Sequence, residues 1–238
     1  MKKLSVKFVV ERFAREAAEL QAYYLIQWNT FGGKSLELTV LAIVAEHSVL
    51  SLAVSWETFV NDYFVAAINR NPGTFKSRLR ERMRDSVKDK YGNRASRYTQ
   101  IALPKHPTAA DVTALTAPNE RNISFKDADS MVQRAAEWLA PEYARLFQSL
   151  TQEEKAFIDG LIGIRNYLAH VSIAASGDMD AALDRLSRAR THHDLGRTGR
   201  KVRNVGAFMR SWSLVYGLPR IVTYCDVARS IGLRLKPP

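Results

Sequence analysis

Cysteine is almost absent from this sequence: Cys225 is the only one in 238 residues. One cysteine cannot form an intramolecular disulfide, and Cys225 has no cysteine or histidine at the short spacing that a structural zinc site requires. These absences exclude a disulfide framework and a cysteine-based zinc centre, and they favour a reducing cytoplasm.

An uninterrupted hydrophobic segment is also missing. Charged residues such as Lys7 and Glu11 follow closely on the N-terminus, so the sequence lacks the apolar centre of a signal peptide. The most apolar stretch, residues 38–56, carries Glu46 and His47 in its middle, where a bilayer penalises charge most. We therefore expect a buried helix with His47 inside a bundle, and no association with a membrane.

Acidic residues are the minority, with 24 Asp and Glu against 35 Lys and Arg, which gives a formal net charge of +11. Much of the excess falls in residues 76–97 and 185–203, and the second segment includes His192 and His193. Such segments suit a polyanion, although a single one also occurs as a solvated helix face. Two of them favour a nucleic acid as the partner. The candidate contacts to it are Arg78, Arg82, Lys88, Arg197 and Arg200.

The hydrophobic pattern is helical, with no alternating strand pattern and no internal repeat. Apolar residues recur at helical spacing over residues 3–30, and Gly32-Gly33 follows. The pattern resumes after Ser35, a candidate N-cap without a capping box, and continues to about residue 69. Residues 73–126 are basic and weakly apolar, which predicts a loop-rich insertion.

Helix signals return after this insertion. Asp127 or Asp129 can cap a helix that runs to Leu139, Pro141 suits the first position of another, and Thr151-Gln152-Glu153-Glu154 is a capping box. The later elements expected are helices over residues 152–174, 179–191 and 204–231, a stop at residues 176–178, a loop at 196–199 and a break at 217–219. The sequence therefore predicts an all-α bundle in which residues 1–72 and 127–238 form one domain.

The hexapeptide Arg165-Asn166-Tyr167-Leu168-Ala169-His170 lies late in the helix expected over residues 152–174. At 3.6 residues per turn, Ala169, Asn166 and His170 lie about 40°, 100° and 140° round the helix from Arg165. One arc therefore holds a cation, an amide and an imidazole. The opposite arc is apolar and is predicted to be buried: Phe157, Leu161, Ile164, Leu168 and Val171.

Three isoleucines, Ile158, Ile162 and Ile173, share the polar arc. A solvated face rarely carries such residues, so we expect a second surface to cover them and Ala169. A homodimer would supply that surface and would enclose a site between its subunits. A solvated helix face is the alternative.

The motif resembles the signature of the HEPN superfamily, which is an arginine, a polar residue, and a histidine after four to six intervening positions. Arg165 and His170 are separated by four residues, and Asn166 is the polar one. The segment Trp56-Glu57-Thr58-Phe59 is similar to the second helix of stand-alone HEPN proteins of the RiboL-PSP type. The resemblance covers residues 1–70 and 127–233 and leaves the basic insertion outside it.

This resemblance implies a dimeric, metal-independent endoribonuclease without a cofactor, of a kind that often serves as a prokaryotic toxin or abortive-infection effector in antiphage defence. The RNA 2′-hydroxyl would be the nucleophile. Arg165 would clamp the scissile phosphate, Asn166 would orient the histidine or donate to the phosphate, and His170 would act as acid or base. Glu57 would pair with Arg165 or reach the site, unless it is a satisfied structural carboxylate.

One position departs from the family pattern. HEPN toxins paired with a nucleotidyltransferase antitoxin often carry a tyrosine two positions after the histidine, and Ser172 stands there in this sequence. A binding antitoxin, another regulatory protein or an inactive resting state fits this residue better than nucleotidylation. Two other functions stay open: a non-catalytic HEPN-like scaffold that binds nucleic acid or a partner protein, and a helical DNA-binding protein, which has no helix-turn-helix pattern to support it.

Overall fold

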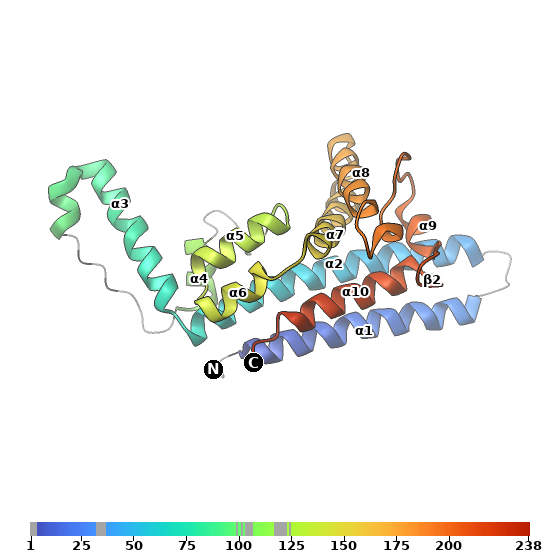
Figure 1. Ribbon diagram of the computed structural model, residues 1–238, viewed down its shortest axis with the longest axis horizontal. Coiled ribbons are helices and arrows are strands. Elements are labelled where there is room, and N and C mark those ends of the chain that lie inside the picture. Colours follow the sequence, from blue (N-terminus) through green and yellow to red (C-terminus); the bar gives the residue numbers. More distant parts are fainter. Residues whose placement is uncertain are drawn as a thin grey trace.

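The computed structural model describes residues 4–31, 37–98, 100, 102, 107–116, 123 and 125–238. Within these ranges the chain forms ten α-helices, one short 3-10 helix and two strands of two residues each. The predicted all-α class is therefore confirmed. Figure 1 shows an elongated molecule in which three nearly parallel helices lie side by side and most other elements lie on one side of them.

The three nearly parallel helices are α1 (Val6–Phe31), α2 (Glu37–Arg70) and α10 (Arg220–Arg234). They form the layer along the lower edge of Figure 1, and α1 packs against both α2 and α10. Phe13 stacks on Phe59 with ring centroids 4.6 Å apart, and its ring edge meets Trp56. The helices predicted over residues 3–30 and from Ser35 to about residue 69 are thus confirmed, while Gly32, Gly33 and Ser35 lie outside the described residues.

Helix α2 is long and apolar enough to cross a bilayer, with a mean hydropathy of 1.8 over its most apolar 18 residues. Buried helices of globular proteins meet the same criterion. In this fold 33% of that window is buried, and residues 59–60 and 63–68 further along α2 are all buried. The prediction for His47 is wrong, because its side chain is exposed on the outer face of α2.

The predicted loop-rich insertion is largely helical. Residues Gly73–Tyr98 form α3, and Ala109–Thr116 form α4. Helix α3 could not be predicted from apolar periodicity, because most of its surface faces solvent. A kink interrupts α3 at Gly92, whose φ of 83° falls in the left-handed region that glycine tolerates. The arm formed by α3 projects from one end of the molecule (Figure 1).

Both ends of this segment belong to the hydrophobic core. Phe75 is buried, and its ring lies 5.5 Å from that of Trp138. At the other end Ile123 is buried, and its backbone N–H donates to Asn61 Oδ1 at 3.1 Å. The segment is therefore anchored to the bundle at both ends.

Three capped helices follow: α5 (Ala128–Trp138), α6 (Pro141–Gln148) and α7 (Gln152–His170). Asp127 caps α5 by accepting from the backbone N–H of Ser130 at 2.8 Å. The Thr151 and Glu154 capping box of α7 and the position of Pro141 at the start of α6 are confirmed. Asp129 is not a cap, and its carboxylate instead pairs with Lys155 at 2.9 Å.

The motif helix ends four residues earlier than predicted. Val171 has φ 43° and ψ 41°, a left-handed conformation that is strained for a β-branched residue, and it ends α7. The Ser172 hydroxyl then accepts from the backbone N–H of Ala175 and caps α8 (Ile173–Ser187). The expected stop at residues 176–178 is therefore wrong, because those residues lie in the first turns of α8.

The last predicted helix is divided into several elements. After the 3-10 helix η1 (His193–Leu195) come α9 (Val205–Arg210), β1 (Trp212–Ser213) and β2 (Leu218–Pro219). The two strands pair in antiparallel fashion, with Trp212 opposite Pro219. The break expected at residues 217–219 is therefore confirmed and is wider than predicted, because a hairpin with a positive φ at Gly217 separates α9 from α10.

Candidate active site

Two long helices bring the candidate catalytic residues together. Glu57 projects from the middle of α2 and Arg165 from the last turns of α7, which packs against α2. The Arg165 guanidinium lies 3.2 Å from the Glu57 carboxylate, and a second nitrogen of Arg165 donates to Asn166 Oδ1 at 3.0 Å. The structure thus joins three of the four predicted site residues into one cluster.

Glu57 sits where water reaches it only in part, with 33% of its side chain exposed. Burial raises the pKa of Glu57 above its ordinary value, and the nearby Arg165 charge opposes that shift without cancelling it. Glu57 also lines a small apolar hollow of about 10 Å³. The lining residues of this hollow are Trp56, Glu57, Val60, Ile123, Phe125, Met131 and Ile162.

His170 is the last residue of α7 and is exposed. In the part of the chain that the structure describes, its imidazole makes no hydrogen bond with Glu57, Arg165 or Asn166. The arc predicted from helical spacing is retained, because the helix is unbroken from Arg165 to His170. The cluster therefore presents a half-buried guanidinium and amide, with a solvent-accessible imidazole about one and a half turns further on.

Two of the three isoleucines that were expected to require a covering surface from a second subunit are covered within this chain. Ile158 is fully buried and Ile162 is 9% exposed, and both belong to the core of this chain. The covering surface is the chain itself: Ile162 shares its hollow with Phe125 and Met131. Sequence periodicity missed this cover because it comes from the end of the weakly apolar insertion and from α5.

Exposed apolar side chains lie instead around the end of α7. Val171 is 74% exposed and Ile173 is 94% exposed, and the neighbouring Ala169 and Ala174 also face solvent. Val171 was expected in the buried stripe, which is wrong beyond Leu168, because the helix ends before Val171. Val171 and Ile173 together flank the turn that follows His170.

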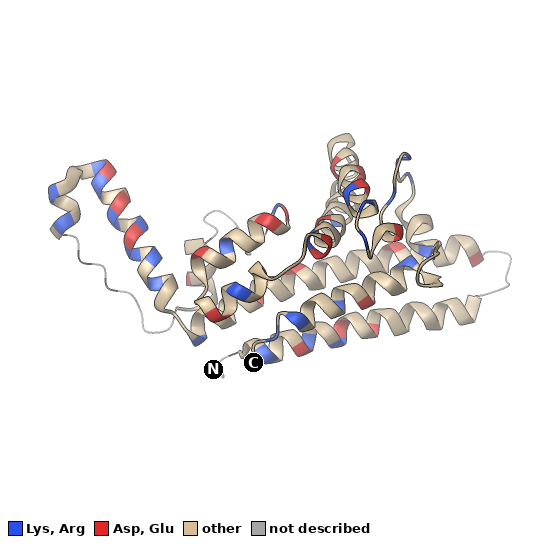
Figure 2. Cartoon of the chain, in the orientation of Figure 1, with Lys and Arg blue, Asp and Glu red and all other residues tan. Residues whose placement is uncertain are grey.

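Three predicted RNA contacts lie on α3, far along the chain from the motif. Arg78 and Lys88 are exposed, and Arg78 pairs with Glu81 at 2.8 Å. Arg82 bonds the Glu137 carboxylate, and its guanidinium lies 4.6 Å from the centroid of the Trp138 ring. Figure 2 shows basic and acidic residues alternating along the arm. Arg82 therefore helps to attach α3 to α5.

The second basic segment runs through the loops after α8. Arg200 is exposed, whereas Arg197 is partly buried and its backbone N–H donates to Leu183 O at 3.0 Å. His193 is exposed, but His192 is half-buried and lies 2.7 Å from the Tyr216 hydroxyl. The His192 environment had no sequence signal, because the hairpin brings Tyr216 to it from 24 positions away.

Metal ligands are not grouped anywhere in the described ranges: no three His, Cys, Asp or Glu side chains are placed to share an ion there. Cys225 is buried on α10, and burial raises the pKa of its thiol far above the ordinary value. Comparison with known proteins adds nothing to this geometry, since no family model, no curated protein and no solved structure matches the chain.

Proposed function

We propose that this protein is a metal-independent endoribonuclease of the HEPN type that acts as a toxin or antiphage effector. The observation that carries the proposal is the cluster of Glu57, Arg165 and Asn166 with His170 at the exposed end of the same helix. These are the residues on which the sequence resemblance depends. Their side chains are accessible enough to meet a phosphodiester.

The proposed reaction is an internal transfer at phosphorus. The 2′-oxygen forms a bond to phosphorus, the bond to the 5′-oxygen breaks, and a 2′,3′-cyclic phosphate remains on the upstream fragment. His170 either removes the 2′-hydroxyl proton or delivers a proton to the 5′-oxygen. Arg165 offsets the negative charge that grows on the phosphoryl oxygens.

Glu57 fits this scheme as a positioning residue for Arg165. Its contact and the Asn166 contact use part of the guanidinium, which leaves the other N–H donors for a phosphate. An anchored guanidinium loses less side-chain entropy when it binds its ligand. The proposed role of Glu57 is therefore to hold the Arg165 guanidinium in place.

The proposed enzyme is a homodimer that associates through the turn after α7. Val171 and Ile173 are apolar, strongly exposed and adjacent to His170, so contact between two such turns would bring two motifs together. This surface replaces the one expected at Ile158 and Ile162. The proposed partners are RNA and a regulatory protein or antitoxin that binds rather than modifies, because Ser172 is engaged as the cap of α8.

A specific observation also favours the second function, a non-catalytic scaffold that binds nucleic acid or a partner protein. The Glu57 and Arg165 ion pair joins α2 to α7. An arginine with a purely structural role would make the same contact. A scaffold gives no reason for an accessible His170 beside it. Catalysis is therefore the function that the site supports best.

The experiment that tests the proposal is incubation of the purified full chain with labelled structured RNA in EDTA. We expect fragments whose upstream ends carry 2′,3′-cyclic phosphate. Intact RNA under conditions in which the protein binds it would overturn the nuclease and favour the scaffold.

A further inference from the structure

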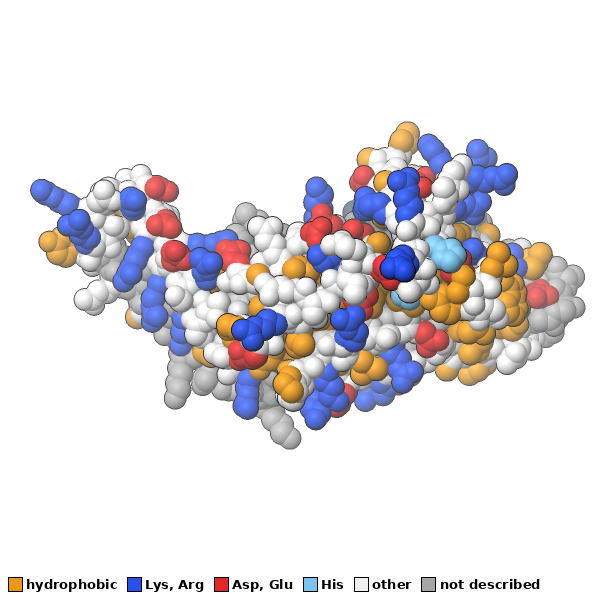
Figure 3. All heavy atoms as spheres, in the orientation of Figure 1, with side chains coloured by type: hydrophobic (Ala, Val, Ile, Leu, Met, Phe, Trp, Pro, Cys, Tyr) orange, Lys and Arg blue, Asp and Glu red, His pale blue; other side chains and the backbone are white. Residues whose placement is uncertain are grey.

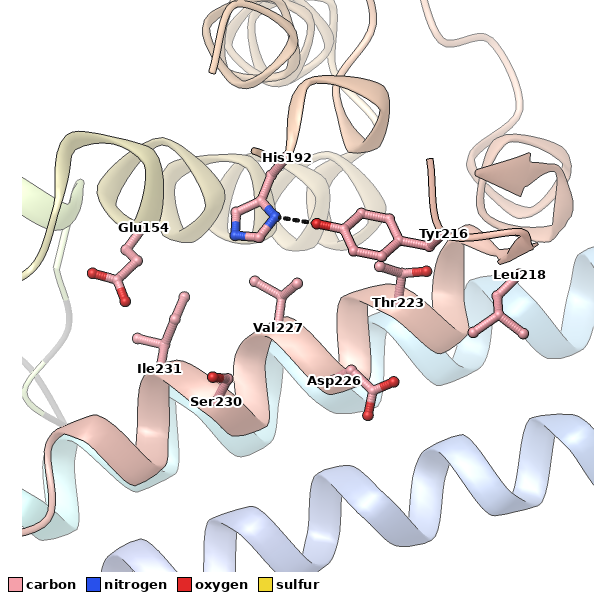
Figure 4. Close-up of a pocket in the computed structure, with 9 residues that line it drawn as sticks. All are labelled: Glu154, His192, Tyr216, Leu218, Thr223, Asp226, Val227, Ser230 and Ile231. Carbon is pink, nitrogen blue, oxygen red and sulfur yellow. Dashed lines mark hydrogen bonds between the residues drawn. The ribbon is translucent and has the colours of Figure 1, made fainter. Parts of the chain in front are cut away.

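A cavity of about 280 Å³ lies between the start of α7, the loop after α8, the hairpin and α10. Figure 4 shows His192 and Tyr216 above it and one face of α10 below. The cavity contains none of the motif residues. Its lining residues are Glu154, His192, Tyr216, Leu218, Thr223, Asp226, Val227, Ser230 and Ile231.

The hydrogen bonds around Tyr216 favour one tautomer of His192. The Tyr216 hydroxyl has one proton, and it donates that proton to the carbonyl oxygen of Thr191 at 3.0 Å, because a carbonyl can only accept. The same hydroxyl lies 2.7 Å from His192 Nδ1, and with its proton directed to Thr191 the donor in that contact is Nδ1. A neutral His192 therefore carries its proton on Nδ1 and has a free lone pair on Nε2.

His192 Nε2 is an unused acceptor at the cavity. No partner for it lies among the described residues, and Figure 4 shows this ring nitrogen turned away from Tyr216. Burial lowers the pKa of His192, although Glu153, Glu154 and Asp194 act in the opposite direction. The imidazole is thus kept neutral and ready to accept a hydrogen bond.

The acidic groups of the cavity are already engaged. Glu154 accepts from Arg234 and from the backbone N–H of Thr151, and Asp226 accepts from Gln21 at 2.8 Å. The remaining surface is mainly apolar, with Val227 below His192 and Ile231 below Glu154 (Figure 4). Asp226 keeps its negative charge because its partner Gln21 is a neutral amide, so the cavity disfavours an anionic group and accepts a flat neutral one that donates a hydrogen bond.

Arg190 is the Lys or Arg residue nearest to His192 in the sequence. Arg190 is exposed two residues before His192, and its backbone is fixed by Glu153. Figure 3 shows histidine and basic side chains close together on this face, next to a group of exposed hydrophobic ones. A neutral ring in the cavity could therefore carry a phosphate that remains at the surface near Arg190.

We propose that this cavity binds a nucleobase whose imino N–H donates to His192 Nε2, as the N3–H of uracil can. The volume suits a single ring system, since sites for larger ligands begin at roughly 300 Å³. Unpaired bases are bound in this manner, by hydrogen bonds to their pairing edge and by contact with aromatic rings. The inference rests on the proposed function and deepens it, because an unpaired base of the RNA substrate carries this imino N–H. A free nucleotide carries the same group.

The test uses the full chain labelled with ¹⁵N-histidine and follows the ring nitrogens of His192 by NMR, assigned with His192→Gln. Uridine 5′-monophosphate should shift the His192 Nε2 signal in a saturable manner. The matched probe, N3-methyluridine 5′-monophosphate, has no imino proton and should bind at least ~10-fold more weakly. An unmoved His192 signal, or equal binding of the methylated probe, would overturn the proposal.

Two further comparisons keep this test separate from the nuclease activity. His192→Phe removes the Nε2 acceptor but keeps an aromatic ring, and it should weaken uridine monophosphate binding, while His170→Ala should leave it unchanged. A 2′-O-methyl oligouridine cannot be cleaved by 2′-hydroxyl attack, and binding tighter than that of the mononucleotide would identify RNA as the source of the base. Equal binding would identify a free nucleotide. Loss of RNA cleavage without loss of these shifts would reject only the nuclease.

Discussion

Glu57 and Arg165 join α2 to α7 across a distance of 3.2 Å, at a point where both side chains remain about one-third exposed. An ion pair with this exposure contributes little to stability. The ion pair lies beside Asn166 and about one and a half turns before His170. It therefore matters more for the geometry of the site than for the stability of the fold.

Replacement of Glu57 should separate stability from positioning. Glu57→Gln keeps the shape and a hydrogen-bond acceptor but removes the charge, so we expect the Arg165 fork to loosen and RNA cleavage to fall by roughly tenfold. The KM for RNA and kcat should be measured separately. A loss confined to thermal stability, with unchanged cleavage, would show that the carboxylate is merely structural.

The same substitution has a definite pH dependence. Burial raises the folded-state pKa of Glu57 above its ordinary value of 4.5, so the folded protein holds this proton more tightly than the unfolded chain. The wild type should therefore gain stability relative to Glu57→Gln as the pH falls through the folded pKa, and lose that gain as the pH rises. Urea unfolding between pH 4 and pH 7 measures the difference; an opposite slope would contradict the assigned shift.

A charge at the turn after α7 should prevent dimerisation. Ile173 is 94% exposed, so Ile173→Asp changes no packing within one chain, but in a dimer it would bury a carboxylate at a cost of about 2 kcal/mol, roughly thirtyfold in Kd. Light scattering at micromolar concentration measures the mass. Leu214→Asp is the matched control, because Leu214 is 91% exposed on the hairpin. Loss of the dimer only in the Leu214 variant would show that the interface lies at the hairpin and not at the turn after α7.

The exposed basic residues of α3 should contribute to RNA affinity. Reversal of charge at Arg78 and Lys88 should weaken binding and lower the slope of log K against log salt by about 0.7 for each RNA phosphate that the arm no longer neutralises. Filter binding of a single-stranded RNA over a range of salt concentrations gives the slope. An unchanged slope would leave the arm as a solvated helix.

Arg82 should behave differently from its neighbours. Its guanidinium bonds Glu137 and covers the Trp138 ring, so Arg82→Ala should lower the free energy of unfolding by about 1 kcal/mol. Arg80→Ala is the control, because Arg80 is exposed and should leave stability unchanged. Equal effects of the two substitutions in urea titrations would show that the interactions of Arg82 with Trp138 and Glu137 add nothing.

Local signals in the sequence predicted much of the fold. The caps at Asp127 and Thr151 and the proline at position 141 act within one turn, so their residues suffice to place α5, α6 and α7. The end of α7 could not be placed in this way. Val171 and Ile173 continue the helical pattern, but Ser172 starts a new helix, and the left-handed Val171 is a conformation that β-branched residues rarely adopt.

Tertiary contacts account for the other differences. Helical spacing put Ile162 on the polar arc, but Phe125 and Met131 cover it from segments whose approach no local pattern reveals. In the same way, Tyr216 reaches His192 only because a hairpin replaces part of the expected last helix. The Glu57 and Arg165 contact was one of the alternatives predicted from the sequence, because a buried carboxylate requires a cation or hydrogen-bond donors.

The most direct test of the account is RNA cleavage by the wild type, His170→Ala and Arg165→Ala, side by side in EDTA, with the fragment ends identified by mass spectrometry. Neither side chain is buried in the core, so both variants should keep the helicity and mass of the wild type. The account predicts 2′,3′-cyclic phosphate ends from the wild type and rates lower by ~10²- to 10⁴-fold from each variant. Folded variants that cut RNA at the wild-type rate would contradict it.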